Sequence, residues 1–247
     1  MKRNVKIVAA SDLHGARLVP LGDEVIRLKP DVFVIAGDLQ GGGYGGREYF
    51  EREFIPMVRL LNSYGIETVL VPGNHDFYLH DLLRQKFVPR GYHLLVDQEE
   101  TICGLRFYGT PWCPFINGKW VFEFQDAVIG QWFQKIPFGL DVLVSHSPPK
   151  GVGDENFDVS MQFKPEYRQH FGSESLRRRI FEVKPRLVLC GHIHSGDHKP
   201  YTYKQDNVTI ANVSLLDERY NRAYGMARMT VMPGRKLRFT PGRKLYD

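Results

Sequence analysis

The stretch VKIVAASDLHG, residues 5–15, joins a short apolar run to a cluster of polar residues. Residues 5–10 are rich in β-branched types, which is typical of a buried strand. The polar cluster contains Asp12 and His14, at the point where such a strand ends. A similar arrangement recurs four times further along the chain, so this stretch predicts both the fold and the place of a site.

The rest of the chain alternates short β-type runs with amphipathic stretches. Pro30 and Pro185 follow two of the amphipathic stretches and help to end them, and Pro56 inside another should kink or break it. This alternation predicts the α/β class, with sheets covered by helices. The further predicted strands are residues 32–36, 67–71, 141–144 and 187–190, and the predicted helices are 21–29, 47–63, 78–87 and 173–183.

The final third of the sequence changes character. Residues 201–245 are rich in β-type and turn residues, which predicts antiparallel strands added to a sheet. The pentapeptide PGRKL, at 233–237 and again at 241–245, predicts a terminal hairpin with its cations in solvent. A patch that binds a nucleic-acid backbone is the alternative. No linker or charge block divides the chain, so residues 1–247 are predicted to form a single domain.

Composition narrows the class of protein. Apolar residues make up 43% and charged residues 25% of the chain, ordinary values for a soluble globular protein. No run approaches the roughly 20 apolar residues of a membrane span, and no secretory signal is expected. Cys103, Cys113 and Cys190 are too few and too scattered for a disulfide framework. The expected setting is the cytoplasm, without a membrane partner, and the oligomeric state is not predicted.

Each of the five predicted core strands ends in a polar cluster. The carboxyl ends of the strands of an α/β sheet form the crevice where ligands bind, so the clusters are expected to meet. They are Ser11-Asp12-Leu13-His14-Gly15, Gly37-Asp38, Gly73-Asn74-His75-Asp76, Ser145-His146-Ser147-Pro148-Pro149 and Gly191-His192-Ile193-His194. Alone, most of these motifs are better explained as turns, caps or loops. All five in this order, each after a strand, favour one shared site.

The side chains in these clusters suit metal ions. Carboxylate and amide oxygens and imidazole nitrogens bind Mn²⁺, Fe, Zn²⁺, Co²⁺ or Ni²⁺, of which Mn²⁺ is favoured here. Seven ligand residues exceed the four of a structural zinc site, but they suit two divalent ions that share a carboxylate. With two aspartates and a hydroxide, two such ions leave about one positive charge, which attracts phosphate.

The combined motifs resemble the signature of the calcineurin-like metallophosphoesterases, from Val5 to about Val213. The resemblance implies a four-layer α/β/β/α double β-sandwich, in which Asp38 bridges two metal ions. It further implies that Asp12, His14 and His194 hold one ion, and that Asn74, His146 and His192 hold the other. By the same resemblance His75 lies near the leaving group rather than on a metal, and Asp76 orients it.

Departures from the family pattern narrow the function further. The Ser/Thr protein phosphatases of this superfamily carry an acidic-Arg-Gly extension after their Gly-Asp, whereas here Gly37-Asp38 leads into a glycine-rich run at 39–46. That run is either a mobile wall of the site or a flexible surface loop. Three further features most resemble the branch of small diesterase-like members. They are the SHSPP string at 145–149, Gly172-Ser173, and the Lys184-Pro185 that precedes LCGHIH.

The sequence therefore predicts a dinuclear metal-dependent phosphoesterase, and more specifically a phosphodiesterase acting on small phosphodiesters or cyclic nucleotides. A metal-bridging hydroxide would attack phosphorus, Asn74 would help to stabilise the equatorial oxygens, and His75 would protonate the departing oxygen. Arg17 is the nearest candidate to contact substrate, although a solvent-facing loop residue is the simpler interpretation. With at most one nearby guanidinium, a singly charged diester is the better electrostatic match.

Three alternatives stay open. A nuclease is favoured only by the basic C-terminus and by Trp112, Trp120 and Trp132, and core or rim packing is the better interpretation of these tryptophans. A phosphomonoesterase would usually add arginines beyond the metals, and the site motifs contain none. A metal-free scaffold is the third, and the intact ligand positions speak against it.

Overall fold

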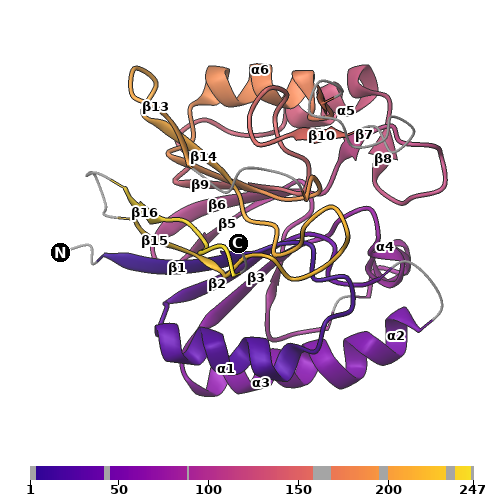
Figure 1. Cartoon of the computed structure of the whole chain (residues 1–247), viewed down its shortest axis with the longest axis vertical. Coiled ribbons are helices and arrows are strands. Elements are labelled where there is room, and N and C mark those ends of the chain that lie inside the picture. Colours follow the sequence, from indigo (N-terminus) through magenta and orange to yellow (C-terminus); the bar gives the residue numbers. More distant parts are fainter. Residues whose placement is uncertain are drawn as a thin grey trace.

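Two β-sheets packed face to face form the centre of the molecule. This computed structural model describes residues 4–41, 45–87, 89–157, 168–194, 200–231 and 237–245. Within them, each of the two sheets has six strands, and helices cover the outer face of each sheet (Figure 1). The layers therefore run helix, sheet, sheet, helix, and the predicted double sandwich is confirmed.

The first sheet is mostly parallel. Its strands are β1 (Val5–Ala10), β2 (Val32–Ala36), β3 (Glu67–Val71), β4 (His93–Leu94), β15 (Ala227–Val231) and β16 (Arg238–Thr240), in the order β16-β15-β1-β2-β3-β4. Strands β1 to β4 run parallel, whereas β15 and β16 add antiparallel at one edge. Alternate side chains face opposite sides of the sheet. Phe33 and Ile35 accordingly pack towards the helices, while Val34 packs towards the other sheet.

The second sheet repeats this plan. It contains β5 (Gln98–Ile102), β6 (Leu105–Thr110), β9 (Val142–Ser145), β12 (Leu187–Cys190), β13 (Tyr201–Tyr203) and β14 (Val208–Asn212), in the order β13-β14-β12-β9-β6-β5. Strands β6, β9, β12 and β14 are parallel, and β5 and β13 close the edges antiparallel. Phe107, Val144 and Leu189 face the first sheet, so residues of both sheets build one shared core.

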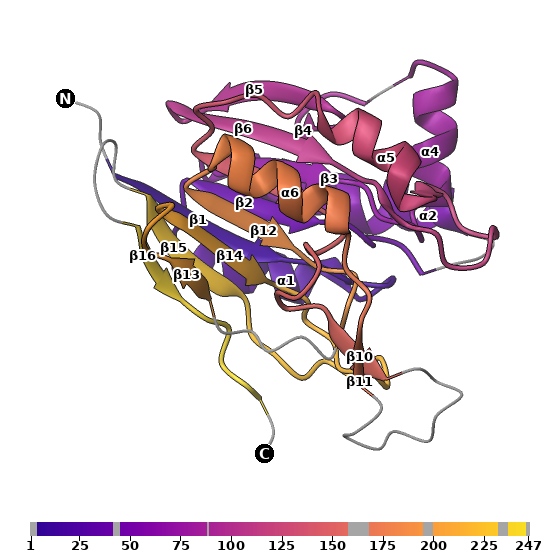
Figure 2. The ribbon, with the colours of Figure 1, turned by 90° about the horizontal axis from the view of Figure 1, so that it is seen from above.

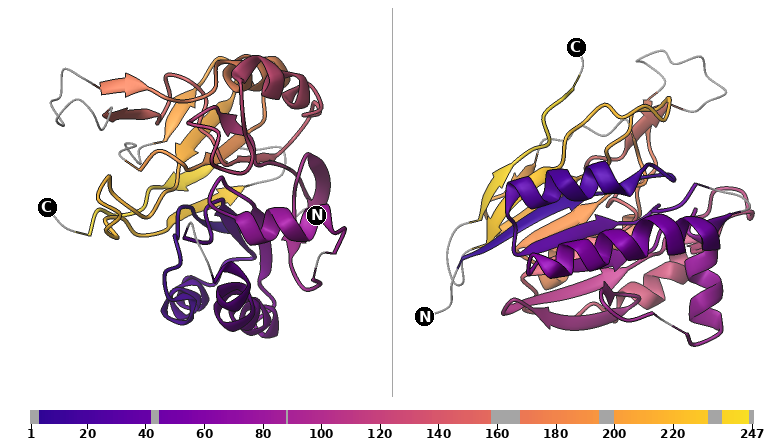
Figure 3. Two further views of the ribbon diagram at one scale, coloured as in Figure 1. Left: turned by 90° about the vertical axis from the view of Figure 1, so that its right-hand side faces the viewer. Right: turned by 90° about the horizontal axis from the view of Figure 1, so that it is seen from below.

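Amphipathic helices complete the two outer layers. Helices α1 (Leu18–Leu28) and α3 (Ile55–Ser63) cover the first sheet, seen from below in Figure 3, and α5 (Asp126–Phe133) and α6 (Glu174–Val183) cover the second, seen from above in Figure 2. The hydroxyl of Ser173 caps α6 by accepting a hydrogen bond from the backbone N–H of Leu176 (2.9 Å). Helix α4 (Phe77–Arg84) follows β3.

The predicted core strands agree closely with the structure. Strands β1, β2, β3 and β12 have the predicted bounds, and β9 is displaced by one residue. Residues 201–245 were expected to add antiparallel strands to a sheet. This is wrong for β14, which pairs parallel with β12. Its five residues are all buried, as expected for a strand inside the sheet rather than one added at its edge. The first PGRKL copy lies almost entirely outside the described residues.

The helix predicted at 47–63 is a continuous segment of three parts. These are α2 (Gly46–Tyr49), a π-helical turn (Phe50–Phe54) and α3. Pro56 lies in the first turn of α3, where its missing N–H and ring do least harm to a regular helix. The chain is therefore not broken at Pro56; a wider π-helical turn directly precedes α3.

Sequence reasoning assigned no element between residues 88 and 140, where β4, β5, β6, β7 (Cys113–Pro114), β8 (Glu123–Phe124) and α5 lie. Strand β6 is central in the second sheet, but its apolar run contains Arg106 and Gly109. Strand β5 is a mostly exposed edge strand of polar residues. Neither has the continuous apolar pattern of the strands that were predicted.

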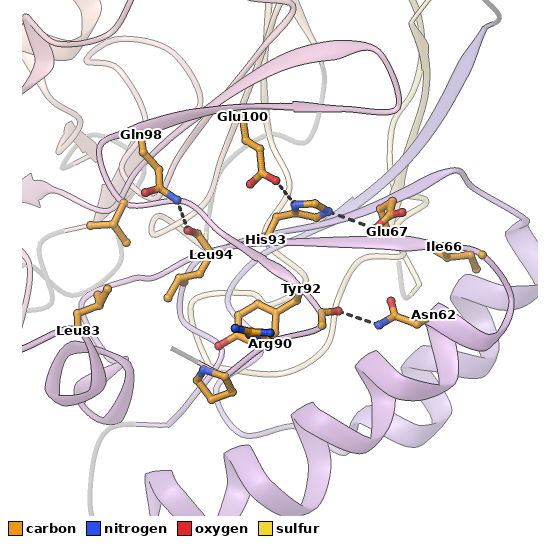
Figure 4. Close-up of a pocket in the computed structure, with 14 residues that line it drawn as sticks. Asn62, Ile66, Glu67, Leu83, Arg90, Tyr92, His93, Leu94, Gln98 and Glu100 are labelled. Atoms are coloured by element: carbon orange, nitrogen blue, oxygen red, sulfur yellow. Dashed lines mark hydrogen bonds and ion pairs between the residues drawn. The ribbon is translucent and has the colours of Figure 1, made fainter. Parts of the chain in front are cut away.

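His93 connects the two sheets at one edge of the sandwich. Its Nδ1 lies 2.7 Å from a carboxylate oxygen of Glu100 on β5, and its Nε2 lies 3.1 Å from one of Glu67 on β3 (Figure 4). These residues line a shallow cavity of about 860 Å³ together with Asn62 and Arg90. The contacts tie the two sheets together where the chain crosses from β4 to β5.

None of the described helices is long and apolar enough to cross a membrane. Each cysteine of the chain is described, and each carries a thiol rather than a disulfide. Burial raises the pKa of Cys113 and of Cys190 well above the usual value, and both side chains are inaccessible. A raised pKa means a smaller thiolate fraction at any given pH, so these two thiols are expected to be unreactive.

Thiol labelling of the native protein at pH 8 should therefore modify Cys103 at most, because it alone is partly exposed. Unfolding in urea without reductant should make all 3 thiols of the chain reactive. Counting modified thiols by mass before and after unfolding checks this. Rapid labelling of Cys113 or Cys190 in folded protein, or fewer thiols after unfolding, would contradict it.

Candidate metal centre

The carboxyl ends of five parallel strands, three from one sheet and two from the other, meet at one side of the sandwich. Hydrogen bonds join the two sets. His146 follows β9, and its Nδ1 donates to the carbonyl of Ala36 at the end of β2 (3.0 Å). His192 follows β12, and its backbone N–H donates to the carboxylate of Asp12 after β1 (3.0 Å). The structure thus brings the predicted strand-end clusters together.

The candidate metal ligands form two neighbouring groups. In each group the ligand atoms all lie within 4.8 Å of one another. One group is Asp12, His14 and His194, and the other is Asp38, His146 and His192. A third set, His14, Asp38 and His75, is equally closely spaced and shares a residue with each of these two groups. Asn74 belongs with the second group, since its Oδ1 lies 2.9 Å from Nε2 of His146. All seven residues that were predicted to be ligands are therefore close together.

Asp38 lies between the two groups. Its Oδ1 is 3.4 Å from Nε2 of His146, and its Oδ2 is 3.6 Å from Nε2 of His14. The two oxygens therefore face different groups, which is the arrangement that a carboxylate shared by two ions requires. The backbone N–H of His75 donates to Oδ1 (2.8 Å) and holds the carboxylate in this orientation.

The backbone at the centre is strained. Four of the candidate ligands have left-handed φ angles: Asp12 (57°), His14 (42°), Asp38 (51°) and His192 (68°). Such a conformation costs a residue other than glycine about 1–3 kcal/mol, and it persists where the surroundings impose it. Here the backbone N–H groups of Leu13 and His14 both donate to the carbonyl of Asp38. Strain concentrated on the ligands is typical of a functional site.

Two glycines allow the ligand loops to approach one another. A Cβ atom on Gly73 would collide with the carboxylate of Asp38, and one on Gly191 would collide with Ser11 and the carboxylate of Asp12. These glycines are therefore required by the close approach of buried carboxylates to the backbone. Both belong to the polar clusters singled out in the sequence.

The histidines present nitrogen atoms suited to a metal. His146 donates from Nδ1 to Ala36, and His194 donates from Nδ1 to the carbonyl of Asp217 (3.2 Å). Each bond directs Nε2 towards the centre, where Nε2 of His194 lies 3.2 Å from Nε2 of His14. A carbonyl bonded to the far nitrogen is the usual support of a metal-bound histidine. These residues therefore fit divalent ions.

Electrostatics at the centre favour the charge states that a metal needs. Burial lowers the pKa of His14 to about 4 and that of His192 to about 3, so both imidazoles are neutral at pH 7. Burial opposes ionisation of Asp12, but the hydrogen bond and charge of His194 outweigh it and lower its pKa to about 2. The centre thus offers ionised carboxylates and neutral nitrogens.

His146 differs from these two histidines. Burial would lower its pKa, but the charge of Asp38 outweighs burial and raises it to about 9. The pKa of His194 is also raised, because Asp12 outweighs the effect of burial. In the metal-free protein at pH 7, His146 therefore carries a proton on the nitrogen that faces the centre.

A cavity of about 350 Å³ opens over the two groups. It is lined by His14, Asp38, Asn74, His75, Ile116, Asn117, Trp120, Asn156, His192, His194, Glu218 and Tyr220. None of these described residues is a lysine or an arginine. The larger cavity beside His93 contains none of the metal-ligand groups found in the described residues.

Two predicted site residues are placed differently from the expectation. Arg17 does not line the cavity over the ligands; its side chain is largely exposed and its Nε lies 3.6 Å from a carboxylate oxygen of Glu53. Asp76 does not hydrogen-bond to Nδ1 of His75, which is buried and has no hydrogen-bond partner among the described residues. Its carboxylate instead accepts hydrogen bonds from the backbone N–H groups of Leu39, Gln40 and Gly73, because the loop turns it inwards. Residues 42–44 of the glycine run lie outside the described residues.

Two aromatic residues of the cavity, Trp120 and Tyr220, were not predicted to belong to the metal site. The ring of Trp120 stacks on that of His75, with centroids 4.1 Å apart and planes at 30°. The ring of Tyr220 packs edge-on against His14 (4.9 Å) and His194 (4.8 Å). The expected core or rim packing describes Trp112 and Trp132, which pack on each other, but Trp120 lines the site. No motif marks either residue in the sequence.

This fold is that of the metallophosphoesterases, a class of metal-dependent phosphoester hydrolases. The chain belongs to the calcineurin-like phosphoesterase family, whose model matches residues 5–196. The matched region contains every predicted ligand.

Similarity to known proteins agrees with this placement. The human metallophosphoesterase domain-containing protein 1 is 31% identical over 155 residues, which cover 52% of this chain and 44% of the relative. The UPF0046 protein T07D4.2 of Caenorhabditis elegans is 26% identical over 227 residues, covering 78% and 52%. The chain thus spans about half the length of these relatives. A dimetal phosphatase from Danio rerio has the same fold, with a TM-score of 0.58, 12% identity and 96% of each chain covered.

The arrangement of Asp38 predicts how the metals are lost. Purified protein should bind two divalent ions. Asp38→Asn should lower the affinity for both ions, because Asp38 contributes an oxygen to each group. His194→Ala should weaken mainly one. Since loss of even an outer support costs about 10–100-fold in metal affinity, loss of a ligand should cost at least as much.

Metal content after dialysis, together with titration calorimetry, measures this effect. His80→Ala is the matched control, because it removes a histidine of α4 that lies outside the metal-ligand groups and should keep both ions. Tight binding of two ions by Asp38→Asn would show that the carboxylate is not shared.

The pKa of His146 predicts proton release. At pH 7 a group with a pKa of about 9 is protonated, so metal binding must displace its proton. His14, with a pKa of about 4, has no proton to lose at that pH. Calorimetry in two buffers with different ionisation enthalpies should therefore detect net release at pH 7, with metal affinity rising up to about pH 9. Binding with no proton release at pH 7 would contradict the prediction.

Proposed function

We propose that the protein hydrolyses small phosphodiesters, cyclic nucleotides included, with two divalent metal ions bound at the centre. The observation that carries this proposal is the charge of the cavity. Its described lining has no lysine or arginine, and it includes the carboxylate of Glu218. A monoester carries nearly two negative charges, and sites that select it usually add guanidinium groups. A singly charged diester suits this lining better.

The residues of the centre divide between the two ions. Asp12, His14 and His194 would hold one, Asn74, His146 and His192 the other, and Asp38 both. When bound, the ions supply Lewis acidity and activate water for attack on phosphorus. The left-handed backbone at four of these residues and the close glycines hold the side chains ready before metal arrives. Mn²⁺ is the ion that we expect to support activity best.

His75 is suited to serve the leaving group. It lines the cavity, and its Nε2 lies 4.0 Å from Oδ2 of Asp38. Its ring nitrogen is also within 4.8 Å of ligand atoms of His14 and Asp38, so it lies beside the residues that would hold the ions. The oxygen of water adds to phosphorus as the ester P–O bond breaks, and the bonding pair goes to the leaving oxygen. His75 in its imidazolium form gives that oxygen a proton and regains one from solvent, and the proton lost by the water passes to solvent. Burial lowers the pKa of His75, so the imidazolium is the minor form at pH 7.

The size of the cavity supports a small substrate. About 350 Å³ accommodates a ligand of nucleotide size rather than a polymer. Of the three tryptophans that could have stacked on bases, Trp112 and Trp132 pack on each other, and Trp120, which lines the cavity, stacks on His75. The proposed function therefore lies with the small diesterase-like members of the family rather than with its nucleases.

The test compares a diester with a monoester of the same leaving group. In Mn²⁺, kcat/KM for bis(4-nitrophenyl) phosphate or a cyclic nucleotide should exceed that for 4-nitrophenyl phosphate. Glu218→Arg places a cation at the cavity and should shift the preference towards the monoester. Asp23→Arg on α1 makes the same charge change on an exposed residue outside the cavity and should leave the ratio unchanged. A wild-type preference for the monoester would refute the diesterase proposal while leaving the metal centre intact.

A further inference from the structure

The ring of His75 is held by other rings rather than by hydrogen bonds. Its Nδ1 is buried and has no hydrogen-bond partner among the described residues. Trp120 stacks on one face (4.1 Å, 30°), and the ring of His14 packs edge-on against it (4.5 Å, 89°). The orientation of the imidazole therefore depends on packing, and Trp120 provides the largest surface.

Trp120 comes from a part of the chain remote from His75. His75 follows β3 of the first sheet, whereas Trp120 lies between two short strands, β7 (Cys113–Pro114) and β8 (Glu123–Phe124), that follow β6 of the second sheet. Pairing of Cys113 with Glu123 closes the base of this segment. We call residues 115–123 the tryptophan loop. The stack thus connects the two halves of the sandwich across the site.

The carboxylate of Glu123 organises the tryptophan loop. It accepts hydrogen bonds from the backbone N–H groups of Ile116 (2.6 Å), Asn117 (3.1 Å) and Trp120 (2.8 Å). A buried carboxylate that accepts several backbone bonds fixes a loop firmly, since each bond replaces one to water. The N–H of Val121 also donates to the carbonyl of Asn74 (3.3 Å), so the loop is tied to a candidate metal ligand.

We propose that Trp120 is a positioning residue for His75. The stack fixes the imidazole plane so that Nε2 points to the leaving oxygen, a task that resemblance to the family had assigned to Asp76. This inference rests on the proposed function, because it requires His75 to transfer a proton to the leaving group. Trp120 acts through His75, and its contribution should appear only where that proton is needed.

The kinetic test uses methyl aryl phosphodiesters whose leaving phenols differ in acidity. Wild-type turnover in Mn²⁺ should depend weakly on leaving-group pKa, because His75 protonates the departing oxygen. Turnover by His75→Ala should depend steeply on leaving-group pKa. Trp120→Ala should lose about 10-fold in turnover on poor leaving groups, which is part of the roughly 10²–10⁴-fold rate gain that a general acid provides. The loss on 4-nitrophenolate should be small, and KM should change little.

A double-mutant cycle separates positioning from general damage. In the His75→Ala background, Trp120→Ala should have no further effect, because its target is gone. Trp120→Phe should restore most of the wild-type leaving-group dependence, since a phenyl ring can still stack. Trp132→Ala is the matched control: it removes a partly buried tryptophan that packs on Trp112 rather than on His75, and it should keep that dependence.

A measurement without turnover tests the stack itself. In metal-free protein the ring protons of His75 should be shifted upfield in the NMR spectrum by the indole ring, with His75→Ala giving the assignment. Trp120→Ala should abolish the shift, and Glu123→Ala should reduce it, because the loop then loses its anchor.

The outcomes distinguish this inference from the proposed function. If wild-type protein hydrolyses none of the phosphoesters with metal, the proposed function fails, whatever the NMR shows. If it hydrolyses them, but Trp120→Ala loses equally on all leaving groups or multiplies the loss of His75→Ala, the positioning role is refuted. An unchanged His75 shift in Trp120→Ala would also refute it.

Discussion

Burial of the Asp38 carboxylate is the constraint on which the rest of the structure depends. It lies in the interior within 4.0 Å of imidazole nitrogens of His14, His75 and His146. A buried carboxylate is costly unless positive groups or hydrogen-bond donors surround it. The strand ends of both sheets supply them, so the face-to-face packing of the sheets and the satisfaction of this charge require each other.

The same constraint explains the local backbone. Asp12, Asp38 and His192 adopt left-handed conformations two residues after their strands end, where their side chains reach the shared centre. Gly73 and Gly191 leave room for the carboxylates that arrive from neighbouring loops. The strained loops persist because three apolar cores stabilise the fold beneath them. One core lies between the sheets, and one lies under each helical layer.

Much of this arrangement could be predicted from the sequence. Strands buried on both faces are continuous apolar runs, so β1, β2, β3 and β12 were located to the residue, and the polar clusters after them could be placed at one edge. Strand β6 could not be found, because Arg106 and Gly109 interrupt its pattern. Contacts that depend on side-chain direction were also out of reach: Asp76 turns to the backbone, and Trp120 reaches His75 from 45 residues away in sequence.

The division of the ligands between the sheets has a consequence for biosynthesis. Asp12, His14, Asp38 and Asn74 emerge early from the ribosome, whereas His146, His192 and His194 follow much later. Both groups proposed to hold an ion draw on both sheets, so a nascent chain that has not yet reached His194 has an incomplete set for one or both ions. In the proposed centre, metal ions would therefore stabilise only chains that have closed the sandwich.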